Sequence, residues 1–406
     1  MLVYNFGIQL YILAIRIAAL FGHAKAKKWL QGRTMQATLL RTRSNRTKSI
    51  WMHCASLGEY EQGFPILQAL KQANPQFNIV LTFFSPSGYE NFKKNDIVDE
   101  CYYLPADTCS NANQFLAQIN LSIAIFVKYE FWPNFLHALK TNEVPTFLVC
   151  GVLREHPFIK WYGSVHRSAL KCFTHFFVQN QSSAAILAQL GFKNFTIAGD
   201  TRYQRAWDNA NSNFADERIE HFCKLHNTVL VCGSTWPKDE QLLASLLKLQ
   251  PQLGLIVAPH HTDDATIKET ENLFLNSQRL SQYREQPSQV LIVDSIGMLR
   301  YLYRYGALAY IGGGFGAGIH NTLEAAAYGK AILCGPRIAK FEEAVALQSM
   351  GALTVVSDAK TLNSAFRSAQ EQAQILEKEL LAYCKQQLGA VEKIAPILAN
   401  FAVVNR

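Results

Sequence analysis

Short apolar runs alternate with helix-like stretches along most of the chain. The runs are rich in Val, Ile, Phe and Tyr, which is typical of strands buried on both faces of a parallel sheet. Helix-like stretches such as 64–72 and 182–190 lie between them. Repeated βα units predict a doubly wound α/β sheet with right-handed crossovers. The predicted strands of this first series are 50–55, 79–84, 100–104, 122–127, 146–150, 175–179 and 195–198.

A polar stretch at 208–213 interrupts this pattern, and we place a domain linker there. A second series of predicted strands follows at 229–232, 255–258, 290–293, 307–311, 331–334 and 353–356, and a helical tail at 362–398 can pack on either lobe. Ligands of open α/β sheets bind beyond the carboxyl ends of the strands, so we expect a cleft between two Rossmann-like lobes. The predicted domains are 1–45, 46–207 and 214–406, the last including the C-terminal helices.

Residues 2–21 are almost wholly apolar and contain one charged residue, Arg16. This length is close to the ~20 residues that span a bilayer. No basic segment precedes it and no cleavage site is evident, which argues against a cleaved signal peptide. A buried core helix is one interpretation. We favour a membrane anchor, and Arg16 near its middle favours an interfacial position over a full span.

Charge is concentrated at the N-terminus. Residues 1–50 carry nine Lys or Arg residues and no acid, which leaves −1 of the net charge of +8 for the rest of the chain. A basic flank on a near-neutral body indicates an anionic membrane surface and not nucleic acid, with the body on the cytoplasmic side. Nine cysteines without a C-x-x-C pair indicate reduced thiols in a cytosolic compartment and not a disulfide framework or a zinc site.

A glycine-rich loop at 312–318 joins the predicted strand 307–311 to a predicted helix at 322–328. Glycines let backbone N–H groups approach a phosphate, and a helix N-terminus attracts an anion. Asn321 and Glu324 have the spacing of a capping box, with Asn321 as the N-cap. Alternatively, Glu324 accepts hydrogen bonds from a ribose, and His320 in the same loop donates to a phosphate.

Three further loops follow predicted strands of the second series. They contain Ser234 and Thr235, then Pro259 and His260, and then Ile296, Gly297 and Met298. Each is weak evidence alone, but together they predict a nucleotide pocket. His260 and His261 could also hold a metal, although no further ligand at the required spacing supports this.

Two glutamates follow strands of the first series. Glu59, in the segment Ser56-Leu57-Gly58-Glu59, could accept a proton from an attacking hydroxyl. Alternatively, Ser56 and Glu59 form a capping box. Glu130 lies among aromatic residues and could orient a substrate hydroxyl or brace the Glu59 loop. In the structural alternative the segment is a turn in which Trp132 fills the core and Pro133 starts a helix.

The combination of Gly58-Glu59, Glu130-Phe131-Trp132-Pro133-Asn134 and His320-Asn321-Thr322-Leu323-Glu324 resembles the 3-deoxy-D-manno-octulosonic acid (Kdo) transferases, which are GT-B glycosyltransferases of lipopolysaccharide assembly. The resemblance implies Kdo transfer from CMP-Kdo to a lipid A precursor (lipid IVA) at the cytoplasmic face of the inner membrane. It implies no metal and no cofactor. It assigns the general base to Glu59 and a second essential acid to Glu130.

The same resemblance implies that CMP is contacted by the segments containing Pro259 and His260, Ile296 to Met298, and Asn321 to Glu324, with Gly313 in the glycine loop. The chain departs from the family pattern in three places. His260 replaces an Arg, Thr322 replaces a Pro, and a Glu-Arg pair is missing from the glycine loop. Arg337 or Lys340 could supply the missing positive charge.

Two other functions share this pattern. One is a nucleotide-sugar 2-epimerase with the same two-lobe architecture, against which the N-terminal segment argues because an epimerase needs no anchor. The other is a membrane-tethered nucleotide-binding protein without catalysis, in which Glu59 and Glu130 are only caps and braces.

Overall fold

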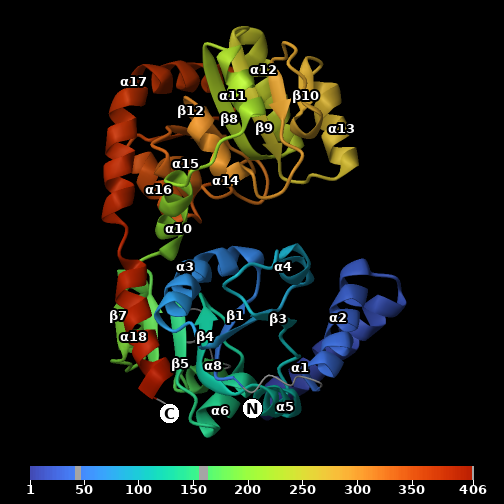
Figure 1. Cartoon of the computed structure of the whole chain (residues 1–406), viewed down its shortest axis with the longest axis vertical. Coiled ribbons are helices and arrows are strands. Elements are labelled where there is room, and N and C mark those ends of the chain that lie inside the picture. Colours follow the sequence, from blue (N-terminus) through green and yellow to red (C-terminus); the bar gives the residue numbers. More distant parts are fainter. Residues whose placement is uncertain (42–46, 155–162, 405–406) are drawn as a thin grey trace. The chain divides into compact units, whose positions relative to one another are not determined.

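The computed structural model of the chain describes residues 1–41, 47–154 and 163–404 (Figure 1). Arg43 and Arg46 of the predicted basic flank lie outside these residues. The chain divides into two compact units. The first contains Met1–Arg205 together with Leu388–Arg406, and the second contains Ala206–Gln387.

The first unit is built on a parallel sheet of seven strands in the order β3-β2-β1-β4-β5-β6-β7. Side chains along each strand point alternately to the two faces of the sheet, and both faces are covered by a hydrophobic core. Trp51 and Phe126 therefore belong to the core on one face, whereas Met52 and Ile125 belong to the core on the other. The strands are β1 Ser49–Cys54, β2 Asn78–Phe83, β3 Glu100–Tyr103, β4 Leu121–Val127, β5 Thr146–Gly151, β6 His175–Val178 and β7 Phe195–Ile197.

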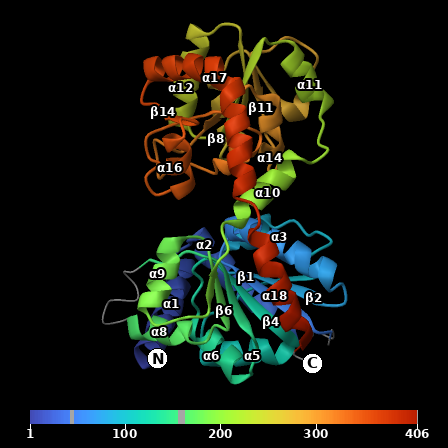
Figure 2. The same ribbon diagram turned by 90° about the vertical axis from the view of Figure 1, so that its left-hand side faces the viewer.

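Helices cover both faces of this sheet, and an N-terminal pair of helices packs against one side of the unit (Figures 1 and 2). They are α1 Leu2–Leu20, α2 Ala24–Arg41, α3 Leu57–Ala73, α4 Pro86–Asn91, α5 Cys109–Gln118, α6 Pro133–Thr141, α8 Gly163–Leu170, α9 Gln181–Gln189 and α18 Ala390–Val404. Helix α10, Thr201–Ala210, runs across the boundary to the second unit.

The second unit contains another parallel sheet of seven strands, in the order β10-β11-β9-β8-β12-β13-β14. Its strands are β8 Thr228–Thr235, β9 Leu253–Pro259, β10 Ser277–Arg279, β11 Val290–Ile292, β12 Leu308–Ile311, β13 Ile332–Cys334 and β14 Leu353–Val355. Its helices are α11 Glu217–Lys224, α12 Pro237–Leu249, α13 Asp264–Leu273, α14 Leu299–Leu302, α15 Leu323–Ala327, α16 Glu342–Ser349 and α17 Ala359–Gln386, with 3₁₀ turns at Leu280–Gln282 and Tyr303–Tyr305. The predicted fold class, two doubly wound α/β lobes after an apolar helix, is confirmed.

The last helix corrects the predicted domain limits. We assigned 214–406 to the C-terminal domain, but α18 lies against α3 and β4 of the first unit (Figure 2). Its residues Ile394, Leu398 and Ala402 are buried in the core of that unit. Burying this apolar face stabilises the first unit, and Gly389, with φ of +102°, provides the turn between α17 and α18.

Helix α1 has one docked side and one exposed side. Tyr4 Oη donates a hydrogen bond to the Asp107 carboxylate (2.6 Å), and Asn134 Nδ2 donates to Asn5 Oδ1 (2.9 Å). The opposite side exposes large apolar side chains, among them Leu2, Val3, Phe6, Leu10, Leu13, Ile17 and Leu20. By length and composition alone, two helical stretches could cross a membrane, Leu2–Leu20 and Ala359–Val404.

Candidate active site

Glu59 lies in the first turn of α3, directly after β1. Its carboxylate accepts a hydrogen bond from the backbone N–H of Ala55, and its side chain is buried, with 5% of the residue exposed. Glu59 thus lies at the carboxyl end of a strand, where the predicted cleft would be, but its side chain is largely shielded from solvent. The Ser56 side chain makes no capping hydrogen bond, so the reciprocal capping box is absent. The Glu59 half of the box is present, because its carboxylate accepts from backbone N–H groups at the start of α3.

Burial raises the pKa of Glu59 to about 7, and the nearby Glu130 carboxylate adds to the shift. The N–H groups of Ala55 and Ser56 and the charge of Lys128 act in the opposite direction. A general base works best when its pKa is close to the working pH, because it is then both deprotonated and basic. Burial gives Glu59 most of this property, and the charge of Glu130 adds to it.

Glu130, in the segment after β4, accepts a hydrogen bond from Trp132 and lies close to His53 of β1. Trp132 Nε1 donates a hydrogen bond to Glu130 Oε2 (2.8 Å), and His53 Nε2 lies 3.4 Å from the same oxygen. Trp132 is only partly buried, and Pro133 starts α6. The turn proposed by the structural alternative is thus present, but Trp132 binds the carboxylate as well as packing on the core.

His53 was not identified from the sequence. It is fully buried on β1, and its Nδ1 lies 2.9 Å from Thr82 Oγ1. Because Trp51 Nε1 already donates to that oxygen (2.9 Å), the Thr82 hydroxyl proton is free to donate to His53 Nδ1. The other ring nitrogen, Nε2, lies on the side of Glu130. No local pattern marks this role, because Thr82 comes from the next strand.

Lys128 occupies a strained backbone position with φ of +73°. Non-glycine residues rarely adopt this conformation, and such strain concentrates at functional sites. The bend directly follows β4 and precedes Tyr129 and Glu130. It therefore turns the chain so that Glu130 comes close to Glu59.

In the second unit, a carboxylate fixes the glycine loop. Asp239, in the first turn of α12, accepts hydrogen bonds from the N–H of Gly313 (2.9 Å), the N–H of Trp236 (3.0 Å) and the Tyr310 hydroxyl (2.8 Å). A Cβ at Gly312 would lie 2.3 Å from the carbonyl oxygen of Ser234, and Gly313 has φ of +89°. Both positions therefore require glycine. An Asp three residues after Trp236, with Pro237 between, is the only sequence signal for Asp239.

The residues predicted for nucleotide binding form an aromatic stack beside this loop. The His260 ring stacks on Trp236 (centroids 4.7 Å apart) and on His320 (4.4 Å), and Trp236 Nε1 donates to His320 Nε2 (3.2 Å). Burial, with smaller effects of His320 and His261, lowers the pKa of His260 to about 4, and burial lowers that of His320. At neutral pH both rings are uncharged, so they offer a phosphate hydrogen bonds but no positive charge.

A cavity of about 260 Å³ lies beside the stack, between α12 and α13. Thr235, Trp236, His260 and His261 line it, together with Glu240. Glu240 accepts hydrogen bonds from Thr235 (2.8 Å) and from Thr270 (3.0 Å). The structure thus brings Thr235, His260 and His320 together, and Ser234 adjoins them with φ of +52°. Pro259, the last residue of β9, directly precedes the stack.

The helix after the glycine loop differs from the prediction. It is α15, which begins at Leu323, so the residue before it is Thr322 and not Asn321. Asn321 Oδ1 accepts from the Leu323 N–H (3.1 Å), and Asn321 Nδ2 donates to Glu324 Oε1 (3.2 Å). Thr322 is fully buried. The predicted capping box is therefore replaced by a tighter turn in which Asn321 and Glu324 hold each other.

The remaining predicted residues lie on two loops. Ile296, Gly297 and Met298 form a turn after β11, in which Ile296 is 59% exposed and Gly297 has φ of +90°. Arg337 donates to the carbonyl oxygen of Gly316, which places its charge at the glycine loop. Arg337, one of the two residues that could supply the missing positive charge, thus lies beside the glycine loop.

Solved structures with a similar fold include a UDP-GlcNAc 2-epimerase and MurG. A UDP-GlcNAc 2-epimerase from Neisseria meningitidis, bound to UDP-GlcNAc, aligns over 87% of this chain and 100% of its own with a TM-score of 0.61 and 14% identity. MurG from Acinetobacter baumannii aligns over 87% and 99% with a TM-score of 0.53 and 12% identity. At these identities the likeness concerns the fold alone.

Sequence relatives give a narrower result. The Haemophilus influenzae 3-deoxy-D-manno-octulosonic acid transferase is 24% identical over 87% of this chain and 87% of its own. The Aquifex aeolicus protein of the same name is 28% identical over 71% and 76%. A bifunctional glycosyltransferase/methyltransferase from Fusobacterium nucleatum is 25% identical over 70% of this chain, which spans about half (47%) of that protein.

Residues 27–205, which include Glu59, His53 and Glu130, match the family described as 3-deoxy-D-manno-octulosonic-acid transferase (kdotransferase). This match and the relatives agree with the motifs found in the sequence. The chain is therefore related to the 3-deoxy-D-manno-octulosonic acid transferases, through the family match over residues 27–205 and through relatives of that name that align over most of its length.

Proposed function

We propose that the chain transfers Kdo from CMP-Kdo to a lipid A precursor, with inversion at the anomeric carbon. The carboxylate pair carries this proposal, because Glu59, with a pKa of about 7, is suited to deprotonate a sugar hydroxyl. As the hydroxyl oxygen attacks the anomeric carbon, its proton passes to Glu59 and CMP leaves. Glu130 keeps the pKa of Glu59 high and is itself held by Trp132 and His53.

The second unit supplies the donor site in this proposal. The departing phosphate lies at the glycine loop, beside the Arg337 guanidinium that donates to the Gly316 carbonyl oxygen, and Asn321 and Glu324 bind the nucleotide. The stack of Trp236, His260 and His320 gives the nucleotide a flat apolar neighbour. Transfer further requires that the bound donor reach Glu59 in the reacting complex.

The direct test incubates the purified full-length chain with CMP-Kdo and a tetraacylated lipid A precursor and separates the products by mass. We expect the precursor to gain Kdo and CMP to be released. Binding of CMP without any Kdo transfer would instead support the non-catalytic alternative. A parallel incubation with UDP-GlcNAc and no acceptor tests epimerisation, and we expect no conversion.

The pKa of Glu59 predicts the pH dependence of transfer. Because the deprotonated form is the base and the pKa is about 7, kcat/KM should rise about tenfold per pH unit below 7 and level off above it. In Glu130→Gln the neighbouring charge is lost, so the midpoint should move to lower pH. A pH profile of both proteins checks this. An unchanged midpoint in the variant would mean that Glu130 does not act on Glu59.

We also propose that the enzyme lies at the cytoplasmic face of the inner membrane, with α1 along the bilayer surface. The exposed apolar side of α1 supports contact with lipid, and the hydrogen bonds of Tyr4 and Asn5 tie the helix start to the first unit. A helix held in this way, with Arg16 near its middle, fits an interfacial position better than a full span.

Vesicle binding tests this position. Phe6→Glu with Leu13→Glu places two charges on the exposed side of α1 and should reduce co-sedimentation with anionic vesicles by at least about tenfold. The control is Leu249→Glu with Leu275→Glu, which makes the same change at exposed apolar positions of the second unit. Equal loss in both variants would assign the effect to net charge and not to α1.

A further inference from the structure

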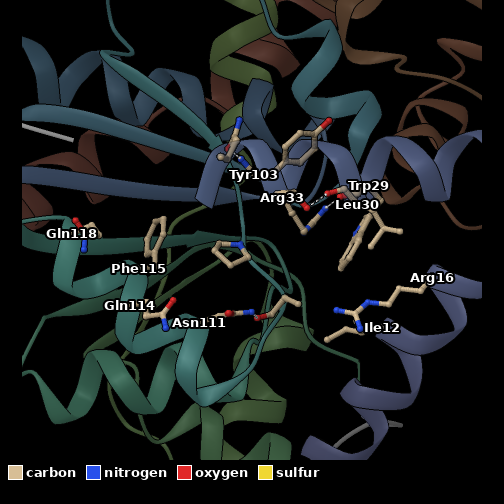
Figure 3. Close-up of a pocket in the computed structure, with 14 residues that line it drawn as sticks. Ile12, Arg16, Trp29, Leu30, Arg33, Tyr103, Asn111, Gln114, Phe115 and Gln118 are labelled. Carbon is tan, nitrogen blue, oxygen red and sulfur yellow. Dashed lines mark hydrogen bonds between the residues drawn. The ribbon is translucent and has the colours of Figure 1, made fainter. Parts of the chain in front are cut away.

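A second cavity, of about 690 Å³, lies within the first unit between the N-terminal helices and the sheet (Figure 3). Its walls come from α1, α2, the segment after β3, and α5. The volume lies within the 300–1,000 Å³ typical of ligand sites. Apolar side chains, including Ile12, Leu30 and Phe115, form much of its lining. None of the residues proposed for CMP binding or catalysis lines it.

Positive charge in this cavity lacks a matching carboxylate. Arg33 of α2 donates hydrogen bonds to the carbonyl oxygens of Leu104 and Phe84, each at 2.9 Å. These acceptors are neutral, so they do not balance the charge of the guanidinium. Burial lowers the pKa of Arg33 to about 9, and no carboxylate among the described residues pairs with it. Arg16 reaches from α1 toward the same space (Figure 3). A bound anion would neutralise this charge.

A buried donor points to the same kind of ligand. Trp29 is 7% exposed and lines the cavity, and its Nε1–H has no hydrogen-bond partner in the part of the chain that the structure describes. A buried N–H without a partner costs about 1–3 kcal/mol. A ligand oxygen would remove this cost, as it would supply the acceptor that the protein lacks.

The position of the cavity identifies the source of the ligand. It lies behind α1, whose opposite side exposes Leu2, Val3, Phe6 and Leu10. An apolar helix face of this kind seats itself among lipid acyl chains. This step rests on the proposed position of α1 at the bilayer surface, which brings lipids, molecules that combine a phosphate with apolar chains, to the edges of this helix and so to the cavity behind it.

We propose that this cavity binds one anionic membrane phospholipid. Its headgroup phosphate pairs with Arg16 and accepts from Trp29 Nε1, while an acyl chain lies along Ile12, Leu30 and Phe115. Arg33 attracts the phosphate by its charge alone, because its N–H groups keep their hydrogen bonds to the carbonyl oxygens of Leu104 and Phe84. This site adds a specific lipid contact to the general attraction of the basic N-terminal segment for an anionic surface.

Lipid retention by the full-length chain tests the proposal. The chain is purified in mild detergent, and retained lipid is counted by native mass spectrometry after addition of phosphatidylglycerol or phosphatidylcholine. We expect one phosphatidylglycerol per chain and several-fold weaker retention of phosphatidylcholine. Arg16→Gln should weaken phosphatidylglycerol binding about fivefold, because each basic residue near a lipid phosphate contributes about 1 kcal/mol.

Two matched controls separate the cavity from the surface. Lys27→Gln removes the same charge from an exposed position of α2 outside the cavity and should leave retention unchanged. Gln114→Trp fills the cavity from its rim and should abolish retention, whereas Asn113→Trp, one residue earlier on α5, should not. Asn113 and Gln114 are both exposed, so a tryptophan at either position should leave the fold intact.

Three results would overturn the proposal. The first is equal retention of both lipids. The second is an equal loss in Lys27→Gln and Arg16→Gln. The third is stoichiometric displacement of phosphatidylglycerol by the lipid A precursor, since this would make the occupant the acceptor and not a membrane phospholipid. All readouts are binding measurements, so they stand whether or not the proposed transfer activity is found.

Discussion

Replacing Glu59 with glutamine is expected to lower turnover by at least ~100-fold, the lower limit of what a general base contributes. Glutamine keeps the size of the side chain and its carbonyl oxygen, so the hydrogen bond from the Ala55 N–H can persist. The amide cannot take the proton of the attacking hydroxyl. Initial rates at saturating CMP-Kdo and acceptor measure this loss.

The control is Glu61→Gln on the same helix. Glu61 pairs with Arg205 at 2.7 Å and is partly exposed, and it lies outside the carboxylate pair. Its replacement should therefore change turnover less than about twofold. The fold should also persist, since exposed ion pairs contribute at most ~1 kcal/mol to stability. If Glu59→Gln turned over like the unmodified enzyme, the general base would have to be another residue.

Stability distinguishes the catalytic interpretation of Glu59 from a structural one. A carboxyl group whose pKa is raised by folding, here from 4.5 to about 7, destabilises the folded state progressively as pH rises through this range. Glutamine does not ionise, so Glu59→Gln should melt at the same or a higher temperature than the unmodified enzyme at pH 8. A lower melting temperature would mean that the Glu59 carboxylate is there to stabilise α3. Catalytic residues often lower the stability of the folded state in this way.

The fold could be predicted because its signals are local. Each strand from β1 to β7 is an apolar run bounded by polar residues, and the glycine loop follows β12 directly. Strand β10 was missed because Ser277–Arg279 contains no apolar residue and lies at the edge of its sheet. Helix α18 was assigned to the wrong unit, because an amphipathic pattern shows that one face is buried but not which core receives it.

The candidate site could be predicted only in part, for a similar reason. Glu59 and Glu130 follow strands of one sheet, so the topology alone favours their proximity. The residues that control them come from elsewhere. His53 depends on Thr82, which is 29 residues away, and Asp239 binds Gly313 across 74 residues. Such contacts leave no periodic pattern, so the partner of neither residue could be recognised, although the spacing of Asp239 after Trp236 marks a helix start.

Asp239→Ala is expected to lower the free energy of unfolding of the second unit by about 3–5 kcal/mol. The residue is 1% exposed, and its removal leaves the Gly313 N–H, the Trp236 N–H and the Tyr310 hydroxyl without their acceptor. Each such buried group costs about 1–3 kcal/mol, less whatever water recovers. Hydrogen exchange measured by mass spectrometry reports the second unit separately and should show faster exchange in residues 308–314.

The comparison variant is Asp263→Ala in the same unit. Asp263 caps α13 by accepting from the Thr266 N–H at 3.1 Å, and its carboxylate is exposed, so its loss should destabilise the unit much less than the loss of Asp239. CMP affinity separates the two further. The Asp239 carboxylate holds Gly313 in place, so Asp239→Ala should also weaken CMP binding, whereas Asp263→Ala should not. If Asp239→Ala lost stability but kept its full CMP affinity, the glycine loop would not be the phosphate site, and the donor would have to be held by the aromatic stack alone.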